Sequence, residues 1–477
     1  MSKYLKLFKA YDVRGTYPEI NEDVYYWSGF GLVKEILKPE NLSLKVNIFR
    51  DCRYTSPEFY KAFYNGVRDG GGMPVTMGLG STDFMYAACQ LFNTPGAMIT
   101  ASHNPKDDNG LKVVKKAPQM LGLQSGLDKV RDFVISKIDI EPISKENWSD
   151  PVEDIEMKKS VWEFYKDKME LLGTIKHIDN LIAQSGKKMK IVVDAGNGMG
   201  GFLMEEIVKL YKNIDFVPLY WDLDGNYPNH PADPSNLANV QDLMIKVREE
   251  KADLGVAFDG DADRAYFVDE KGEFMRDNYL VCAIAKSILE EYYLNPDLDF
   301  NPAIVYSQPQ SRCVPYTTLE SNGAAVASKQ GHTYMKADMS RYKAIYGGEG
   351  TGHHYFGKFG FMDSGALVMV KLVQILVKTS VLPSEILKPY SSKYFLSGEI
   401  NFKITDGMSF EDIKNKLLSK YVDGSISTMD GVSIFYPDWK LNARSSNTEP
   451  LLRLNVECIG INKLEEKIAE VRKIIGL

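Results

Sequence analysis

Three aspartates at alternate positions, Asp259, Asp261 and Asp263, are the strongest chemical signal in this sequence. On an extended segment, residues i, i+2 and i+4 point to the same side, so the three carboxylates would repel one another unless a cation neutralised them. Hard oxygen ligands of this kind select Mg²⁺ or Ca²⁺. The spacing therefore predicts a divalent metal site.

A calcium-binding loop of the helix–loop–helix kind is one alternative for this segment. The three aspartates would fill ligand positions one, three and five, and Glu270 would fill position twelve. The glycine that such a loop needs at position six is Arg264 here, and the apolar flanks predict strands rather than helices. We therefore reject the calcium loop. A solvated acidic turn is also disfavoured, because apolar strands precede and follow the run.

A second cluster, residues 100–105, places a hydroxyl on a tight turn directly after an apolar run. Pro105 prevents the preceding residue from continuing a helix, so Ser102 is expected on a loop. His103 can be neutral or charged near pH 7, and Lys112 is a nearby cation that could steady a phosphoryl group. Ser and Asn are also common turn formers, and the spacing alone leaves both interpretations open.

A third cluster, residues 347–354, contains four glycines, which allow close approach of a ligand or of side chains. Glu349 and Thr351 within it suit hydrogen bonding to vicinal sugar hydroxyls. His353 and His354 raise the question of zinc, but adjacent histidines on a turn point in different directions and no cysteine is near. A glycine turn with a packed histidine remains the alternative.

A fourth cluster begins at Arg444 and continues with Ser445, Ser446, Asn447 and Thr448. Arginine can bind a phosphate bidentately, while hydroxyl, amide and backbone N–H groups fill the remaining phosphate oxygens. An apolar run follows, so we expect a turn at the entry of a strand. An ordinary polar turn with an exposed arginine is the alternative.

The elements that must position these clusters are short apolar runs, each ending in a polar or glycine-rich turn and followed by a helical pattern. The predicted strands of this type cover residues 45–49, 96–99, 190–193, 252–258, 303–306 and 344–346. Strands that alternate with helices predict α/β layers. Ligands gather at the carboxyl ends of such strands, where the serine, aspartate and glutamate clusters lie.

The last ~90 residues have a different pattern, with predicted strands at 398–404, 432–436 and 451–456 and helices at 410–418 and 464–475. This pattern predicts an α+β tail. Polar stretches at 138–151 and around 381–384 predict domain boundaries. A third break near 271–273 could equally be a hairpin within one domain.

Composition limits the classes of function. The 477 residues suggest about three or four domains at roughly 100–200 residues each. A net charge of −7 argues against a protein wrapped on nucleic acid, which needs a basic face. A few local Arg and Lys side chains can still bind an anionic small substrate.

The five cysteines are scattered and never spaced as CxxC, so neither a zinc site nor a disulfide framework is expected. The N-terminal residues carry no apolar signal core. The longest apolar stretch, residues 367–377, is broken by Lys371 and Gln374 and predicts a buried helix rather than a membrane span. We expect a cytoplasmic protein with no membrane partner.

Together, the clusters resemble the motifs of the α-D-phosphohexomutase superfamily, and within it the bacterial-type phosphomannomutase/phosphoglucomutase enzymes. Residues 11–15, Tyr-Asp-Val-Arg-Gly, are similar to the N-terminal signature. Residues 100–105 match the phosphoserine loop, 259–264 the metal loop, 348–353 the sugar loop and 444–448 the phosphate loop. The resemblance covers nearly the whole chain, in the family's order.

The resemblance implies three related α/β domains with mixed sheets and a smaller α+β C-terminal domain around a central cleft. The expected ranges are 1–152 (phosphoserine loop), 153–270 (metal binding), 271–383 (sugar recognition) and 384–477 (phosphate clamp). It also implies a mutase that moves a phosphoryl group between C1 and C6 of a hexose through phosphorylated Ser102 and a hexose 1,6-bisphosphate.

The implied site residues follow from the matching motifs. Mg²⁺ would contact Ser102, Asp259, Asp261 and Asp263, and the transferred group would be stabilised by Arg14, Lys112 and Arg264. The sugar would be bound by Tyr11, His332, Glu349 and Thr351, and the proton would be carried by His103 or His353. The non-reacting phosphate would be bound by Arg444, Ser446, Asn447 and Thr448.

Two departures concern sugar preference. Gly350 and Thr351 stand where the family usually has methionine and serine, and an expected lysine is missing near residues 308–310. The alternatives are a phosphoglucosamine mutase, a non-catalytic sugar-phosphate-binding protein and a metal-dependent phosphatase. A monomer or weak homodimer is expected.

Overall fold

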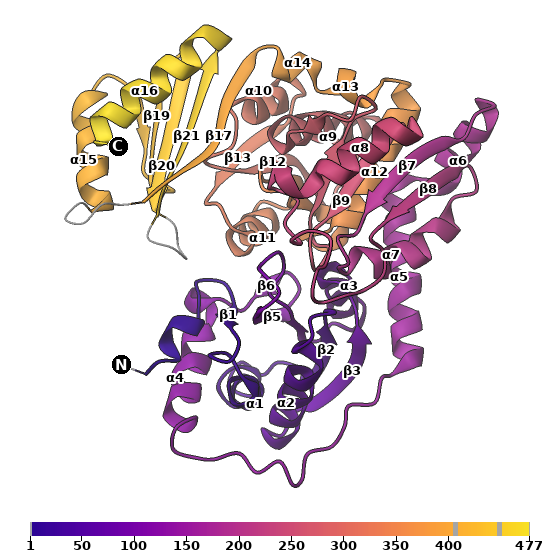
Figure 1. Ribbon diagram of the computed structural model, residues 1–477, viewed down its shortest axis with the longest axis vertical. Helices are drawn as coiled ribbons and strands as arrows, with labels where there is room; N and C mark the ends of the chain where they lie inside the picture. The colour runs from indigo at the N-terminus through magenta and orange to yellow at the C-terminus, as the bar shows by residue number, and fades with distance from the viewer. Residues whose placement is uncertain (1, 404–408, 446–450, 477) are drawn as a thin grey trace. The chain divides into compact units, whose positions relative to one another are not determined.

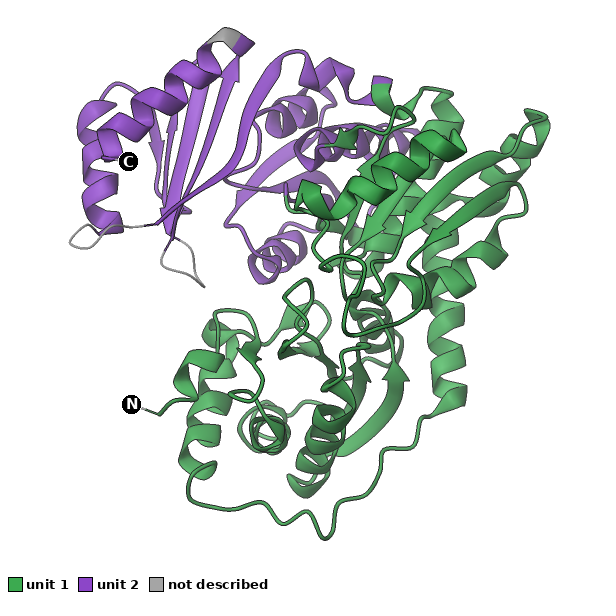
Figure 2. Ribbon diagram, viewed as in Figure 1, with its two compact units in different colours: residues 1–275, 351–384 green, residues 276–350, 385–477 purple. Residues whose placement is uncertain are grey.

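The computed structural model describes residues 2–403, 409–445 and 451–476. The chain divides into two units, one of residues 1–275 with 351–384 and the other of residues 276–350 with 385–477 (Figure 2). The four domain ranges proposed from the sequence stay a prediction.

The first unit contains a mixed sheet in the order β1-β5-β4-β2-β3, with β6 paired to β5 (Figure 1). Its strands are β1 (Val13–Thr16), β2 (Lys45–Arg50), β3 (Met73–Leu79), β4 (Gly96–Ile99), β5 (Asp108–Lys116) and β6 (Gln119–Met120). Strands β2, β3 and β4 are parallel, while β5 runs antiparallel to β1 and β4. The carboxyl ends of β2 and β4 therefore lie at one edge.

A second mixed sheet of this unit has the order β11-β10-β9-β7-β8. Its strands are β7 (Met189–Asp194), β8 (Ile214–Leu219), β9 (Leu254–Phe258), β10 (Ala265–Val268) and β11 (Phe274–Met275). The uncertain break near residue 271 is a hairpin, because β10 and β11 pair antiparallel across it. The hairpin of β15 (His354–Phe356) and β16 (Met362–Asp363) also belongs to this unit.

The helices of the first unit are α1 (Glu22–Gly31), α2 (Ser56–Asp69), α3 (Thr82–Phe92), α4 (Leu127–Lys137), α5 (Ile155–Gly173), α6 (Ile175–Gln184), α7 (Gly200–Ile207), α8 (Gln241–Glu250) and α12 (Gly365–Thr379). Helix α12 confirms the predicted buried helix, and Lys371 and Gln374 are buried with it, Lys371 Nζ donating to Gln374 Oε1 at 2.6 Å. Its first turn is capped by Ser364, whose hydroxyl accepts from the Leu367 N–H.

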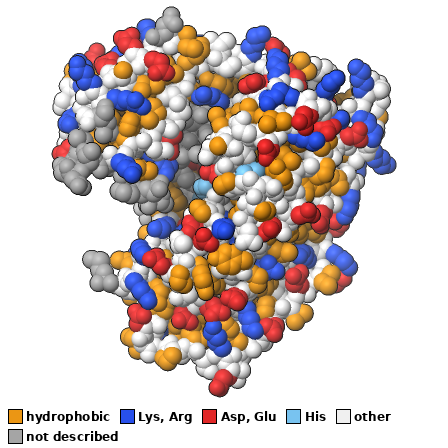
Figure 3. All heavy atoms as spheres, viewed as in Figure 1, with side chains coloured by type: hydrophobic (Ala, Val, Ile, Leu, Met, Phe, Trp, Pro, Cys, Tyr) orange, Lys and Arg blue, Asp and Glu red, His pale blue; other side chains and the backbone are white. Residues whose placement is uncertain are grey.

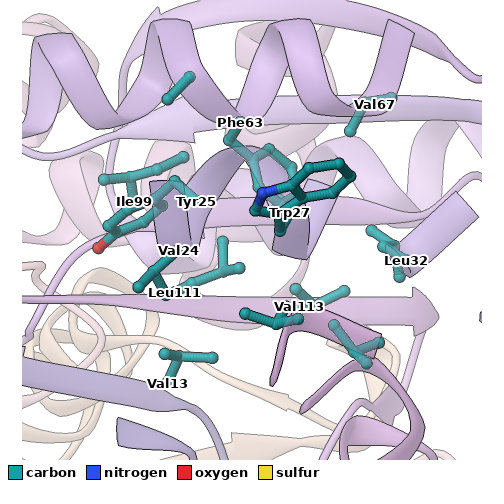
Figure 4. Packing of buried hydrophobic residues seen from close by; sticks show 14 of the residues in the cluster. Val13, Val24, Tyr25, Trp27, Leu32, Phe63, Val67, Ile99, Leu111 and Val113 are labelled. Carbon is teal, nitrogen blue, oxygen red and sulfur yellow. The ribbon is translucent and has the colours of Figure 1, made fainter. Parts of the chain in front are cut away.

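Helices α1 and α2 pack closely over the first sheet. Figure 4 shows Trp27 and Phe63 from these helices among Val24, Ile99 and other apolar side chains of one buried cluster. A Cβ on Gly66 of α2 would lie 2.0 Å from the Tyr26 carbonyl oxygen, so this crossing requires glycine.

The second unit contains a parallel sheet in which β12 lies between β13 and β14, and an antiparallel sheet in the order β17-β21-β20-β19-β18. The strands are β12 (Asn301–Ser307), β13 (Ala324–Ser328), β14 (Ala344–Gly348), β17 (Tyr394–Lys403), β18 (Ser425–Ser427), β19 (Val432–Phe435), β20 (Trp439–Ser445) and β21 (Leu451–Ile459). Its helices are α9 (Asp277–Leu294), α10 (Cys313–Glu320), α11 (His332–Arg341), α14 (Lys388–Ser391), α15 (Phe410–Lys420) and α16 (Leu464–Ile475), and α13 (Pro383–Ile386) connects the units along the chain.

The predicted class, α/β domains followed by an α+β tail, is confirmed. Within residues 2–403, 409–445 and 451–476, no helix is both long and apolar enough to cross a membrane. Acidic and basic side chains are interspersed on the face drawn in Figure 3.

Candidate active site

Ser102 lies on the turn after β4, as the sequence predicts. Its side chain is buried, and its φ of +55° is in the left-handed region that a residue with a Cβ rarely adopts. The Ser102 N–H donates to Thr100 Oγ1 at 2.9 Å, which helps to hold the turn. The Ser102 hydroxyl donates to Asp259 Oδ2 at 3.0 Å, so the serine oxygen adjoins the aspartate cluster.

The three aspartates lie on the turn between β9 and β10. The predicted extended conformation is wrong, because Ala262 has a φ of +60° and its N–H donates to the Asp259 carbonyl at 3.0 Å, which closes a tight turn. The carboxylates still converge: one oxygen from each of Asp259, Asp261 and Asp263 lies within 4.8 Å of the others, and all three residues are buried.

The charges in this cluster fit a divalent cation. Within the described part of the chain, Asp261 Oδ1 and Asp263 Oδ1 are buried and accept no hydrogen bond. Burial and the neighbouring aspartates raise the pKa of the Asp259 carboxyl although Arg264 opposes the shift. Buried carboxylate oxygens with free lone pairs are the ligands that Mg²⁺ prefers, so the residues present suit that ion.

Lys112, on β5, is the first cation beside the carboxylates. Its Nζ donates to Asp261 Oδ2 and to Asp263 Oδ2, at 2.7 Å in each case. Burial lowers the pKa of Lys112, but the two carboxylates outweigh burial and the pKa is raised. The ammonium therefore stays charged and joins the first sheet to the aspartate turn.

Arg264 is the second cation. Its Nε and Nη2 donate to Asp259 Oδ2 at 2.9 and 2.7 Å, and its Nη2 also donates to Ser102 Oγ at 3.2 Å. The guanidinium thus contacts both the serine oxygen and the carboxylate beside it. A phosphoryl group on that oxygen would meet a fixed positive charge.

Arg14, on β1, is the third cation and is tied to the serine loop. Its Nη1 donates to the Ala101 carbonyl at 3.2 Å and to Asn104 Oδ1 at 2.8 Å, and its Nε donates to Asp12 Oδ2 at 2.7 Å. Tyr11 lies two residues before β1 and is half-buried. The signature at residues 11–15 therefore runs beside the serine loop.

The two candidate proton carriers have opposite electrostatics. Burial, together with Arg264 and the other nearby cations, lowers the pKa of His103 well below its ordinary value. Burial also acts to lower the pKa of His353, but Asp363 and Asp263 outweigh it and the pKa is raised. His103 is therefore a neutral imidazole, whereas His353 favours the protonated form.

The sequence motifs do not include two residues of this site. Asp363 lies at the end of β16, and its Oδ2 is 2.6 Å from His353 Nδ1. Thr82, at the start of α3, donates from Oγ1 to Asp261 Oδ2 at 2.6 Å. Asp363 is the one charged residue among residues 359–370, which is a usable signal, whereas a threonine before an apolar helix is too common to single out Thr82.

The predicted sugar cluster is split between the two units. In the first unit, the Thr351 carbonyl accepts from the Tyr266 hydroxyl at 2.7 Å. In the second unit, Glu349 is buried and its Oε1 accepts from the Gly331 N–H at 2.9 Å, beside His332. His332 Nδ1 lies 3.4 Å from Nζ of Lys336, a buried lysine that belongs to none of the predicted clusters.

Arg444 lies within strand β20, so its predicted place on a strand-entry turn is wrong. It is buried, and its Nη2 donates to Glu399 Oε2 at 2.7 Å. The other three members of the predicted phosphate loop, Ser446, Asn447 and Thr448, lie outside the described residues.

Comparison with known proteins agrees with this geometry. Three family models match the chain: phosphoglucomutase/phosphomannomutase alpha/beta/alpha domain I at residues 5–131, domain II at 172–272 and domain III at 276–394. A Vibrio cholerae phosphomannomutase is 33% identical over 99% of both chains. A Pseudomonas syringae phosphomannomutase/phosphoglucomutase is 31% identical over 99% of this chain and 94% of its own.

A solved structure gives the same result. The Burkholderia thailandensis phosphoglucomutase/phosphomannomutase family protein superposes with a TM-score of 0.77 at 25% identity, covering 99% of this chain and 98% of its own. These findings identify the α-D-phosphohexomutase superfamily, and within it the chain belongs to the phosphoglucomutase/phosphomannomutase family. The predicted class of enzyme, an isomerase of the phosphomutase type, is confirmed.

Proposed function

We propose that this protein interconverts hexose 1-phosphates and hexose 6-phosphates through phosphorylated Ser102 and a hexose 1,6-bisphosphate. The observation that carries the proposal is the position of Ser102 Oγ, 3.0 Å from Asp259 Oδ2 and 3.2 Å from Arg264 Nη2. A single esterifiable oxygen thus lies between a metal-binding carboxylate and a fixed cation. Family membership supports the same activity.

Mg²⁺ is the proposed metal, held by Asp259, Asp261, Asp263 and an oxygen of the Ser102 phosphate. When bound, it would supply positive charge to the phosphoryl oxygens. The described geometry supports this choice through the two carboxylate oxygens that accept no hydrogen bond from the described residues.

The residues of the chain would act mainly by positioning and by neutralising charge, as expected for a loose phosphoryl-transfer transition state. The bond between phosphorus and Ser102 Oγ breaks while a bond to the free sugar hydroxyl forms. Arg264, Lys112 and Arg14 would stabilise the equatorial oxygens. The bisphosphate then turns around, and its other phosphate returns to Ser102.

His353 and His103 are the proposed proton carriers, with different roles. The attacking sugar hydroxyl must lose a proton, and the released Ser102 oxygen must gain one. His103, whose Nδ1 lies 3.4 Å from Ser102 Oγ, is a weak base because burial and nearby cations lower its pKa, so it would relay a proton rather than hold one. His353 beside Asp363 can hold the proton because its pKa is raised, so it would be the main proton carrier.

Substrate recognition is assigned to both units. Glu349, Thr351, His332 and Tyr11 would bind the sugar. Arg444, together with Ser446, Asn447 and Thr448, would bind the non-reacting phosphate. The phosphate would replace the Glu399 carboxylate as the partner of the Arg444 guanidinium. Hexose phosphates are therefore the proposed small-molecule partners, and a cytoplasmic monomer or weak homodimer is the proposed state.

A side-by-side assay with the 1-phosphates of glucose, mannose and glucosamine tests this function. We expect formation of the 6-phosphate from glucose or mannose, with Mg²⁺ and a trace of hexose 1,6-bisphosphate present. Turnover of the glucosamine phosphate alone would favour the phosphoglucosamine mutase. Free phosphate without isomerised sugar would indicate a phosphatase, and no product from any substrate would refute catalysis.

The Asp363→Asn variant should lower kcat by about 10- to 100-fold with KM nearly unchanged. The substitution removes the negative charge that holds protonated His353, but it retains the size of the side chain. Steady-state kinetics would measure this effect. Asp132→Asn, on the exposed side of α4, is the control and should behave as the parent. Parental kcat in the Asp363 variant would contradict the role of this pair.

A further inference from the structure

Arg53, three residues beyond the end of β2, has a buried side chain whose five N–H donors are all bonded. Its side chain is 0% exposed. A guanidinium has five N–H donors, and the five acceptors here are Asp51 Oδ2 and four backbone carbonyls. The Nε donates to Asp51 at 3.1 Å, Nη1 donates to the carbonyls of Pro105 (2.6 Å) and Asp108 (2.9 Å), and Nη2 donates to those of Ser102 (2.8 Å) and Asn104 (2.7 Å).

The four carbonyls all belong to residues 102–108, the loop that begins with Ser102. A loop of this length cannot direct four carbonyls to one point unless its backbone is fixed. The Ser102 carbonyl belongs to the residue with the left-handed φ of +55°, a conformation that persists only where its surroundings determine it. Arg53 therefore holds the serine backbone on its carbonyl side, as Thr100 does on its N–H side.

The guanidinium is itself held in place. Asp51 accepts from the Arg53 N–H at 3.0 Å and from the Ser56 hydroxyl at 2.5 Å, so this carboxylate is fixed before it orients the guanidinium. The ring of Tyr227 lies 5.2 Å from the Arg53 guanidinium carbon, within the range of a cation–π contact.

The same region touches the aspartate turn. A Cβ built on Gly260 would lie 2.4 Å from the Ser102 carbonyl oxygen and 3.2 Å from the Tyr227 hydroxyl. The Ser102 carbonyl is thus packed against the turn that carries the carboxylates, while Arg53 binds it. A shift of this carbonyl would change the distance between Ser102 Oγ and the carboxylates.

We propose that Arg53 is a positioning residue for phosphoryl transfer: it fixes the 102–108 backbone so that Ser102 Oγ faces the three carboxylates. It acts on backbone carbonyls and not on the transferred group. This inference rests on the proposed function, because it concerns the same serine. Lysine could keep the charge, but it cannot reproduce the planar fork that serves four carbonyls and a carboxylate together.

The Arg53→Lys variant tests the proposal. We expect kcat to fall about 100-fold, the penalty typical of a misplacement near 1 Å, while KM for the hexose phosphate changes less than about threefold. Single-turnover phosphorylation of Ser102 by glucose 1,6-bisphosphate, followed by intact mass, should slow by the same factor. Arg248→Lys is the matched control, because Arg248 Nη1 also donates to a backbone carbonyl, that of Gly272 at 3.0 Å.

The outcomes are distinct. A folded Arg53→Lys protein that phosphorylates Ser102 at the parental rate would overturn the inference, and so would a variant in which KM rises while kcat is unchanged. If the variant does not fold, Asp51→Asn, which loosens the same guanidinium, is measured in its place and judged by the same two results. If the parent itself takes up no phosphate, the proposed function fails rather than the role of Arg53.

Discussion

The Ser102→Ala protein should lose hexose phosphate interconversion by at least about 1,000-fold and should take up no phosphate from glucose 1,6-bisphosphate. The reason is geometric, because Ser102 Oγ is the hydroxyl that contacts both Asp259 and Arg264. Alanine removes this oxygen and adds no bulk. Intact-mass measurement and a coupled assay would follow the two losses separately.

Substrate binding separates this prediction from a general loss of structure. The affinity for hexose phosphate, measured by calorimetry, should stay within about threefold of the parental value, since the proposed sugar and phosphate contacts lie on other residues. Ser136→Ala is the control, because this serine is exposed on α4 and bonds its own helix at the Phe133 carbonyl. Phosphate uptake by the Ser102→Ala protein would show that another residue carries the phosphoryl group.

Local sequence patterns predicted the elements well where one physical effect dominated. Apolar runs before polar turns located β2, β4, β7, β9 and β14, because burial of both faces of a parallel strand leaves a continuous apolar run. Strand β20 was missed. Its Lys440, Asn442 and Arg444 alternate with apolar residues, yet both faces are buried, and Lys440 Nζ bonds the Gln310 carbonyl.

The residue types of the site were predictable from the sequence, but the backbone conformation and the long-range contacts that bring them together were not. The spacing of the aspartates correctly indicated that their carboxylates converge. The carboxylates converge through a turn with Ala262 in the left-handed region, and an alanine gives no signal of that conformation in the sequence. Contacts such as those of Lys112 and Thr82 with Asp261 join distant parts of the chain. Only the tertiary fold specifies such pairs.

The Asp261→Asn protein should bind Mg²⁺ at least about 100-fold more weakly than the parent. The amide keeps the size of the carboxylate but removes a charge from a buried oxygen set. Asp261 Oδ1 accepts no hydrogen bond from the described residues, while Oδ2 accepts from Lys112 and Thr82. The substitution therefore removes a candidate ligand oxygen without leaving an existing donor wholly unpaired.

Titration calorimetry with Mg²⁺ gives a readout that does not depend on turnover, and the Mg²⁺ concentration for half-maximal activity should shift in the same direction. Asp242→Asn is the control, because this aspartate is exposed on α8 and accepts from the Tyr220 hydroxyl. Parental Mg²⁺ affinity in the Asp261→Asn protein would exclude this residue from the metal site.

The Lys112→Met protein should bind Mg²⁺ more strongly than the parent in the same calorimetry, while its kcat is lowered. The reason is that the Lys112 ammonium neutralises Asp261 and Asp263 together, so a cation at the carboxylates must share these oxygens with it.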